Sequence, residues 1–403
     1  MELGPIWRSM LRNKGGFILI AVQIAVTMTI MVNAVAIIQQ RSGDMARPSG
    51  LDEVNTFTLA SVVFVEGIDK KRLIDEDLDR IRNVPGVVNA TSSNSFPLRR
   101  GGWSEGIRLE PGEGVSDSST ALYFADEHTV ETFSLRLIEG SNFASNQVDW
   151  VDRESNDRPS VAIVSRELAR DLFPDEQGAY VGRTFYTGND NPVTIIGVVE
   201  RLQAPWPNWS GLERSMLVPQ RRDDDSVLYI VRTQPGSRDE LMPRIEEMLA
   251  SSSRDRIIQS VTTMEDARKM AYLGEAAMNK ILVFVVALLT VITGLGVVGL
   301  ASFNVSRRTR QIGIRRALGA SRGSIVRHFL VENLLVSTVG VAAGGVLAVA
   351  LSMLLVEAFA LEPLQWYLIP AAMVLLLLVG QGAVAGPARR AGNVSPAIAT
   401  RST

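Results

Sequence analysis

The sequence contains no cysteine, and this excludes several classes of site. Without cysteine the chain forms no disulfide scaffold, no thiol nucleophile and no Cys-ligated zinc or iron–sulfur site. Histidine occurs only at His128 and His328, so we expect no multi-histidine metal site. The phosphate-cradling pattern GxxxxGK[ST] is also absent, and the chain alone is not expected to hydrolyse ATP. We therefore predict no catalytic residue, no metal site and no cofactor in this chain, and no nucleic-acid partner.

Charged residues are scarce, and long stretches have none. Only 21% of the 403 residues are charged and 46% are hydrophobic, a mixture that indicates membrane spans plus a sizeable soluble domain. About 20 apolar residues at a rise of about 1.5 Å each cover the hydrocarbon core of a bilayer. Four uncharged runs of 21 to 23 residues reach this length, and we predict a transmembrane helix at each: Phe17–Ile38, Ile281–Phe303, Leu334–Val356 and Trp366–Gly386.

The first run also has the basic residues in front of it that a signal peptide has, namely Arg8, Arg12 and Lys14. Its 22 residues are long for the apolar region of a signal peptide, and no small-residue cleavage pattern follows it. We therefore interpret it as a retained helix.

The basic residues of the short loops predict the orientation in the membrane. Basic residues precede the first run, follow the fourth run at Arg389 and Arg390, and are most frequent in the loop between the second and third runs. The loop between the third and fourth runs has two acidic residues, Glu357 and Glu362, and no basic residue. Both termini and the Arg-rich loop are thus expected in the cytoplasm. The long segment 39–280 then lies outside. It has 28 basic and 39 acidic residues, a charge of −11, against +9 for the rest.

The two ends of this external segment have the same pattern. Near the start, a strand-like run at Val54–Glu66, a helical stripe at Lys70–Asn83 and a strand at Val87–Thr91 form a β-α-β unit. Near the end, a second unit follows the same order: Val227–Thr233, Ser237–Ala250 and Ile257–Val261. Two such units commonly pair into a ferredoxin-like layer.

The middle of the external segment, 96–225, is predicted to be a mostly β insertion with one or two helices. Val161–Val164 and Val193–Val199 are strong strand candidates, and Ser165–Phe173 is a short helix capped by Ser165 and ended by Pro174. The predicted fold class is thus a membrane protein with four transmembrane α-helices and a large extracytoplasmic α+β domain between the first and second helices.

The predicted domain organisation, in residue numbers, is a cytoplasmic N-terminal segment 1–16, helix 17–38, external domain 39–280 (ferredoxin-like parts about 54–95 and 226–265, insertion about 96–225), helix 281–303, cytoplasmic segment 304–333, helix 334–356, short external loop 357–365, helix 366–386 and cytoplasmic tail 387–403.

Small residues recur inside two of the predicted spans. Gly294, Gly296 and Gly299 match a dinucleotide fingerprint, but no strand precedes them and no acid follows about 20 residues later. Glycines at this spacing let membrane helices approach closely. We predict helix packing at these three glycines and at Gly340 and Gly344.

The segment Arg307–Glu332 is too basic to span a bilayer, because each arginine at mid-membrane costs about 2.5–3.5 kcal/mol. Apolar residues recur through it at helical spacing, from Ile314 and Leu318 to Ile325 and Phe329, which predicts one apolar face. Gly319 is expected to mark a bend between two short helices. Two interpretations stay open on the pattern alone: an amphipathic helix on anionic lipid, or a projection that docks into a cytoplasmic partner.

The stretch from Arg308 to Ser321, RTRQIGIRRALGAS, resembles the signature of the FtsX/MacB/LolE permeases of mechanotransmission, or type VII, ABC systems. The closing motif from Pro387 to Pro396 is similar to theirs, and Arg158–Phe173 and Val181–Val199 resemble the MacB-type periplasmic domain. The order of one span, a large external domain and three further spans is also that of the family.

This resemblance implies a stand-alone permease, without a fused ATPase, in the bacterial inner membrane. ATP and magnesium would be bound by a separate ABC ATPase subunit, and a second permease, either the same chain or a paralogue, would pair with this one. A periplasmic adaptor and an outer-membrane channel are further partners that the resemblance suggests, and membrane lipids surround the helices. The residues implied to couple to the ATPase are Gly313, Arg315, Arg316, Leu318, Gly319 and Ala320.

The implied function is to couple ATP hydrolysis in the partner to movements of the periplasmic domain, as in MacB-like extrusion of periplasmic cargo. Two alternatives remain open. One is FtsX-like signalling to a periplasmic partner, and the other is an ATP-independent sensor or scaffold.

Overall fold

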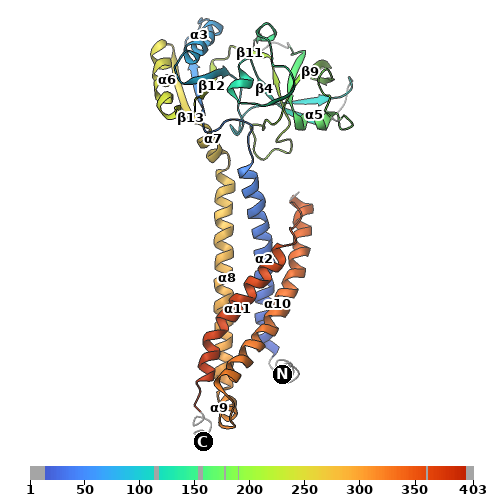
Figure 1. Ribbon diagram of the computed structural model, residues 1–403, viewed down its shortest axis with the longest axis vertical. Coiled ribbons are helices and arrows are strands. Elements are labelled where there is room, and N and C mark those ends of the chain that lie inside the picture. Colours follow the sequence, from blue (N-terminus) through green and yellow to red (C-terminus); the bar gives the residue numbers. More distant parts are fainter. Residues whose placement is uncertain are drawn as a thin grey trace. The chain divides into compact units, whose positions relative to one another are not determined.

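A computed structural model describes residues 14–112, 118–152, 158–176, 178–188, 190–359 and 362–395 (Figure 1). It divides into two units, a helical unit of Met1–Ala46 with Glu275–Thr403 and a unit of Arg47–Gly274, which we call the external unit after its predicted location. Residues 1–13 of the predicted N-terminal segment and 396–403 of the predicted tail, with Arg8, Arg12 and Arg401, lie outside the described residues.

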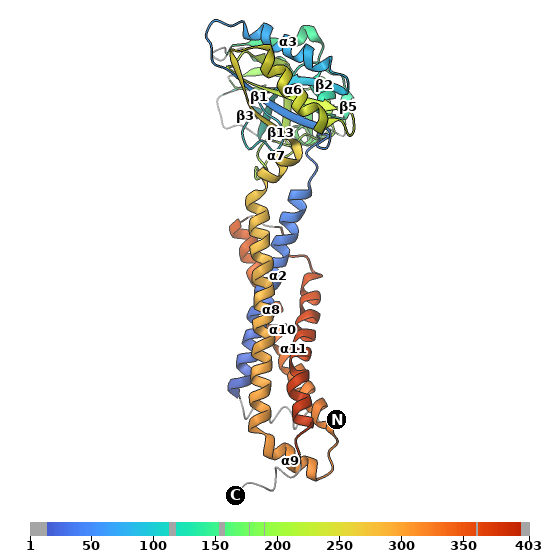
Figure 2. The ribbon, with the colours of Figure 1, turned by 90° about the vertical axis from the view of Figure 1, so that its left-hand side faces the viewer.

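Within the described residues of the helical unit, four helices are long and apolar enough to cross a membrane. Each contains one of the predicted uncharged runs, except that the fourth run begins two residues before its helix. A short helix, α9, joins two of them (Figure 2). The bounds are α2 Lys14–Ala46, α8 Leu273–Arg307, α9 Thr309–Ala317, α10 Arg322–Phe359 and α11 Leu368–Gly392.

The helices extend past the uncharged runs, and this shifts two predicted boundaries. The external unit begins at Arg47 rather than at residue 39 and ends at Gly274 rather than at 280, because α2 and α8 continue into polar turns. The predicted cytoplasmic segment 304–333 includes the last turn of α8, all of α9 and the first turns of α10.

Helix α2 packs inside the helical unit rather than along its outside. Its Ile24 and Met28 are 1% and 0% exposed and lie in one apolar core with side chains of α8, α10 and α11. Polar groups add contacts between helices: the hydroxyls of Thr27 and Thr293 lie 2.8 Å apart, and Asn33 donates to the Ala348 carbonyl at 3.1 Å. These buried contacts are typical of a helix that belongs to a membrane bundle.

The external unit begins and ends with the two predicted β-α-β units. Their strands form one antiparallel sheet in the order β13-β1-β12-β2, the arrangement of a ferredoxin-like layer. The prediction is confirmed, with bounds that differ by a few residues. The elements are β1 Thr56–Val63, α3 Lys70–Arg82, β2 Val87–Ser92, β12 Ser226–Thr233, α6 Arg238–Ser252 and β13 Arg256–Thr263.

Helices α3 and α6 cover one face of this sheet. Ile74, Leu78 and Ile81 of α3 and Ile245 of α6 are 0–1% exposed and pack against Phe57 and other strand residues. The opposite face, with Ile230, packs into the core of the insertion. The central strands β1 and β12 are thus mostly buried, whereas the edge strand β13 is partly exposed.

The insertion is a mostly β subdomain, as predicted. Its main sheet has the order β5-β9-β7-β10-β4-β3-β8, and β8 also pairs with β9, so the sheet closes into a barrel. The elements are β3 Trp103–Arg108, β4 Ser118–Phe124, α4 Thr129–Thr132, β5 Leu137–Gly140, η1 Ser145–Gln147, β6 Asp149–Val151, β7 Val161–Ser165, α5 Arg166–Leu172, β8 Thr184–Thr187, β9 Asn191–Val199, β10 Ser215–Val218 and β11 Gln220–Arg222. Strands β6 and β11 form a separate pair.

The short helix α5 has the ends that its sequence predicts. The Ser165 hydroxyl accepts a hydrogen bond from the Leu168 amide at 3.3 Å, and Pro174 follows just after the helix ends at Leu172. The cap satisfies one of the amides that every helix start leaves without an intrahelical partner.

Candidate functional site

The predicted coupling residues lie at the turn between α9 and α10. Gly319 has φ +95°, a left-handed conformation that glycine adopts without strain. The Ala320 amide donates to the Arg315 carbonyl at 3.0 Å and the Gly319 amide to the Arg316 carbonyl at 3.2 Å. These two bonds form a Schellman motif, which satisfies carbonyls at the end of α9. Ser321 caps the start of α10, since its side chain accepts a hydrogen bond from the Ser324 amide at 3.2 Å.

This turn holds Leu318 outward. Leu318 is 84% exposed and Ile314, one helical turn earlier, is 47% exposed, whereas Ile312 and Gly313 are buried in the helical unit. Leu318 and Ile314 are thus large apolar side chains that the helical unit leaves uncovered.

The prediction of one apolar face through this segment is wrong. Ile325 and Phe329 are 4% and 6% exposed and pack into the core of the helical unit, while Ile314 and Leu318 point out of it. The reversal at Gly319 breaks the helical phase, so spacing counted across it does not define one face. The second helix is also not short, because Arg322 begins the 38-residue helix α10.

Exposed arginines surround Leu318 in the sequence. Arg315 is exposed, Arg316 is half-buried, and Arg310, Arg322 and Arg327 are exposed nearby. Arg308, just before α9, instead pairs with the buried Glu332 of α10 at 3.0 and 3.1 Å. This ion pair ties the start of α9 to α10. The pattern alone did not predict it, because the two residues are 24 positions apart.

The predicted packing glycines differ in their surroundings. A Cβ on Gly344 would lie 2.5 Å from Met28 Cβ, and one on Gly340 would lie 2.9 Å from Ile24 Cβ, so α2 and α10 touch at both. A Cβ on Gly296 would meet the Gln23 side chain at 2.5 Å, and one on Gly294 would make an ordinary contact with Val379 at 3.7 Å. Gly299 departs from the prediction, because a Cβ there would have no described atom within 4 Å.

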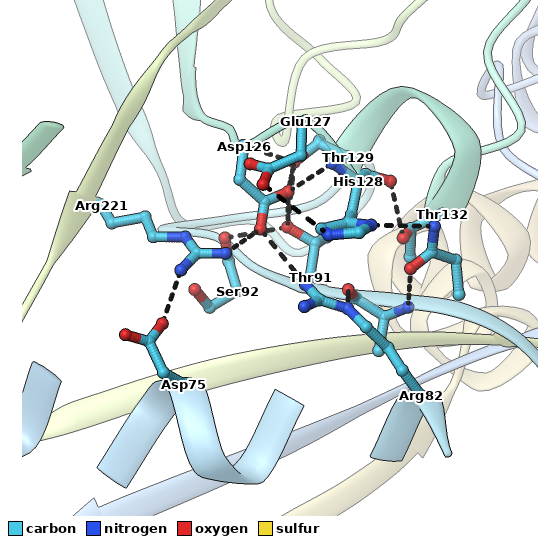
Figure 3. A network of polar contacts seen from close by, with 12 residues as sticks. Asp75, Arg82, Thr91, Ser92, Asp126, Glu127, His128, Thr129, Thr132 and Arg221 are labelled. Atoms are coloured by element: carbon cyan, nitrogen blue, oxygen red, sulfur yellow. Dashed lines mark hydrogen bonds and ion pairs between the residues drawn. The ribbon is translucent and has the colours of Figure 1, made fainter. Parts of the chain in front are cut away.

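The external unit contains a buried polar network between the ferredoxin-like layer and the insertion (Figure 3). Asp126, which is 0% exposed, accepts hydrogen bonds from the hydroxyls of Thr91 at 2.8 Å and Thr129 at 2.9 Å. Arg221 donates to Asp126 and, at 2.7 Å, to Asp75 of α3, while Arg82 lies 3.5 Å from Asp126. The network thus joins α3 and β2 of the layer to β11 and the loop before α4.

The charges of this network favour an ionised Asp126. Burial disfavours the carboxylate, but the charge and hydrogen bonds of Arg221, together with the two threonine hydroxyls, outweigh burial and lower the pKa of Asp126 below its ordinary value. Burial also lowers the pKa of Arg82, whereas the charge of Asp126 leaves the pKa of Arg221 raised. Arg221 is therefore the principal partner of Asp126.

A second buried pair lies under the ferredoxin-like sheet. The side chains of Asp77 and Arg256 are both 0% exposed and pair directly, and Tyr229 donates to Asp77 at 2.7 Å. Arg256 also donates to the Leu249 carbonyl at 2.8 and 3.1 Å. Both networks tie elements of the fold together.

Among the described residues, no group of three or more His, Asp or Glu side chains gathers as metal ligands do. His128 is half-buried before α4, and its Nδ1 lies 3.2 Å from the Asn89 amide nitrogen. The acidic run 223–225 lies between β11 and β12, where Asp225 pairs with Lys70 at 2.6 Å. These contacts are structural.

Two protein-family models match the chain, and together they cover most of it. The MacB-like periplasmic core domain matches residues 17–248, and the FtsX-like permease C-terminal domain matches residues 283–396. The chain is an ABC permease of the MacB/FtsX family. The predicted family and fold class are thus confirmed. With four helices able to span a membrane, this MacB/FtsX-type permease is a multi-pass inner-membrane protein.

Curated relatives of this permease are named macrolide export ATP-binding/permease protein MacB. The protein of Photorhabdus laumondii is 24% identical over 417 residues, which cover 97% of this chain and 59% of the relative. That of Escherichia coli K12 is 25% identical with the same coverage, and that of Chromobacterium violaceum is 27% identical over 65% of this chain and 40% of the relative. The chain therefore spans between 40% and 59% of the length of these relatives.

Among solved structures, the extracellular domain of the noncanonic ABC-type transporter YknZ from Gram-positive bacteria matches 50% of this chain at 15% identity. The match covers 100% of that domain, and the TM-score of 0.32 is too low to bear on the fold of the permease.

Proposed function

We propose that this permease couples ATP hydrolysis by a separate ABC ATPase subunit to movements of its external unit. Leu318 carries the proposal, because it is 84% exposed on a turn that a Schellman motif holds in one conformation. An apolar side chain that is fixed in this way, with arginines around it, suits insertion into an apolar pocket with an acidic rim. The chain itself is then a non-catalytic subunit, and ATP and magnesium bind in the partner.

The proposed orientation places this turn in the cytoplasm, where ATP is available. Support comes from the basic residues, since exposed Arg389 and Arg390 end α11 and exposed arginines surround the α9–α10 turn. Short basic loops face the cytoplasm in multi-pass proteins. The external unit, with its excess of acidic residues, is then periplasmic.

The proposed work of the external unit is MacB-like extrusion of periplasmic cargo. The match to the MacB-like periplasmic core domain and the names of the relatives support it. A second permease, identical or paralogous, completes the assembly, with a periplasmic adaptor and an outer-membrane channel as further proposed partners. FtsX-like signalling to a periplasmic protein is the alternative within the same family.

The coupling proposal is tested by Leu318→Ala in the chain reconstituted with its ATPase subunit. A fully buried leucine contributes about 1.5–3 kcal/mol, so we expect association at least about ten-fold weaker. Deleting Arg315–Ala320 should abolish association and leave membrane insertion intact. The matched control is Met353→Ala. Met353 is also exposed, at 67%, but it lies near the end of α10 that is far from the α9–α10 turn.

Unchanged affinity in both the Leu318→Ala and the deletion variants would remove this turn from the ATPase contact. If the deletion instead lowers binding to vesicles of anionic lipid and no ATPase associates with the parent chain, the basic turn is a lipid anchor and the sensor or scaffold alternative holds.

A further inference from the structure

The external unit is attached to the membrane helices by two stretches of chain. The first runs from Arg47, directly after α2, to β1, and the second is helix α7, Met264–Ala271, which ends two residues before α8 begins. These two connections are the covalent links between the units, so a motion of α2 or α8 that travels along the chain passes through them.

Both connections are built into the core of the external unit. In the second, Met264 and Ala267 of α7 are 0% and 6% exposed and lie in the apolar core of the insertion. In the first, Ser49 is 1% exposed, and its carbonyl accepts from the Gln203 amide at 2.9 Å. Gly50 has φ +97° and lies so close to Arg201 that a Cβ would be 2.5 Å from its carbonyl oxygen.

A two-bond ion pair joins the two connections directly. Arg268 of α7 donates from Nε to Glu53 at 2.7 Å and from Nη2 to the other carboxylate oxygen at 2.5 Å. The same Nη2 donates to the Arg47 carbonyl at 3.0 Å, and the Ser49 hydroxyl donates to Glu53 at 2.5 Å. We call the Glu53–Arg268 pair the connection clamp.

The connection clamp is partly shielded from water, since the side chains of Glu53 and Arg268 are 18% and 23% exposed. Burial raises the pKa of Glu53, but the bonds from Arg268 and Ser49 outweigh it and leave that pKa lowered. The pKa of Arg268 is raised, chiefly by its hydrogen bond to Glu53. Both groups are therefore charged in the folded unit, and a paired fork of this kind is strongly directional.

We infer that the connection clamp is a positioning device that makes the two connections move together, so that a push along one helix turns into motion of the whole external unit. The reason is geometric: if one connection slides past the other by a few ångströms, both parallel bonds break at once. This inference rests on the proposed function, because it requires a motion delivered by the helices.

The experiment measures transmission in the full chain, reconstituted in lipid nanodiscs with its ATPase subunit. The chain has no native cysteine, so Arg254→Cys in the external unit and Glu357→Cys at the end of α10 take spin labels selectively. The readout is the change in label-to-label distance between the nucleotide-free state and the state trapped with ATP and vanadate. Association with the ATPase and thermal unfolding are measured in parallel.

We expect Glu53→Gln and Arg268→Gln each to lose more than half of the nucleotide-dependent distance change while the ATPase still associates. The charge swap Glu53→Arg with Arg268→Glu should restore much of the change. The matched control is Lys269→Gln, the next residue of α7, whose pair with Asp266 at 3.0 Å is exposed and lies within one helix. It should behave as the parent does.

A full distance change in both clamp variants would overturn the inference and leave the proposed function standing. Loss of folding in both variants, without rescue by the swap, would also overturn it, because the pair would then serve stability alone. No distance change in the parent would contradict the proposed function itself.

Discussion

Asp126 shows at the scale of one residue how the external unit joins its two layers. Its carboxylate is buried, and hydroxyls and Arg221 satisfy it, with Arg82 as a weaker neighbour (Figure 3). A buried carboxylate with a lowered pKa contributes stability above its unfolded pKa. That contribution is lost as the pH falls through its lower, folded pKa.

Replacing Asp126 by Asn should destabilise the external unit by about 3–5 kcal/mol at neutral pH, because Arg221, whose side chain is only 11% exposed, loses its principal counter-charge and keeps Asp75 alone. The difference in unfolding free energy between the variant and the parent should shrink as the pH falls through the folded pKa of Asp126. Denaturant unfolding across this pH range measures it. The control Asp152→Asn, on a side chain that is 73% exposed, should shift stability by less than about 0.5 kcal/mol. A pH-independent difference would contradict the ionised state of Asp126.

The Asp77–Arg256 pair makes a related prediction that depends on coupling. Asp77→Leu alone should cost about 3–5 kcal/mol, since Arg256 stays buried without its partner. The double variant Asp77→Leu with Arg256→Met should cost less than the sum of the two single variants, because no unpaired charge remains. A double-mutant cycle on unfolding free energies measures this, and additive costs would show that the pair does not act as a unit.

At the scale of elements, the α9–α10 turn depends on a backbone conformation that few residues tolerate. Gly319→Ala should destabilise the left-handed conformation of this turn by about 1 kcal/mol. Because the proposed binding requires the folded turn, ATPase association should weaken roughly five-fold. Gly319→Asn is the matched variant, because Asn tolerates this conformation and should lose less. Equal losses in a titration of the two variants with ATPase subunit would mean that side-chain volume, not the backbone, matters at this position.

The contact between α2 and α10 makes a prediction about packing. Gly344→Val places a Cβ where Met28 and the Ala25 carbonyl already lie, at 2.5 and 2.8 Å, and should destabilise the helical unit by about 1–3 kcal/mol. Gly382→Ala, where a Cβ would have no described atom within 4 Å, should be neutral. Thermal unfolding in mild detergent compares the two variants. An unchanged melting temperature for Gly344→Val would show that α2 and α10 are not in close contact at Gly344.

The sequence predicts those elements whose signals are local. The helix α3, the cap of α5 and the strands of both β-α-β units were expected to within a few residues, because period and capping are encoded in neighbouring positions. The closure of the barrel through β8 and β9 was not expected. The alternation of residues along one strand does not show which strand lies beside it.

The sequence likewise predicts only part of the candidate coupling site. Gly319 and its neighbours were found by their resemblance to a family signature, and the left-handed φ explains why glycine stands there. The expected apolar face failed because a turn in the middle of the segment resets the helical phase. The pairs Arg308–Glu332 and Glu53–Arg268 join residues 24 and 215 positions apart, so only the folded chain brings them together.

At the scale of the whole molecule, charge and apolar length divide the chain into parts with different surroundings. The uncharged lengths of four helices suit a bilayer, and the basic turn and the last turn of α11 suit its cytoplasmic surface. The acidic segment 39–280, with a charge of −11, contains the external unit. The proposed coupling of ATP hydrolysis to motion of the external unit requires this division.

The most direct test of the central claim is purification of the tagged protein from its native host in mild detergent, followed by mass spectrometry of the proteins that accompany it. We expect a stoichiometric ABC ATPase subunit, which Leu318→Ala depletes, and any paralogous permease would be recovered with it. A preparation without an ATPase, repeated with nucleotide and after crosslinking, would contradict the coupling account.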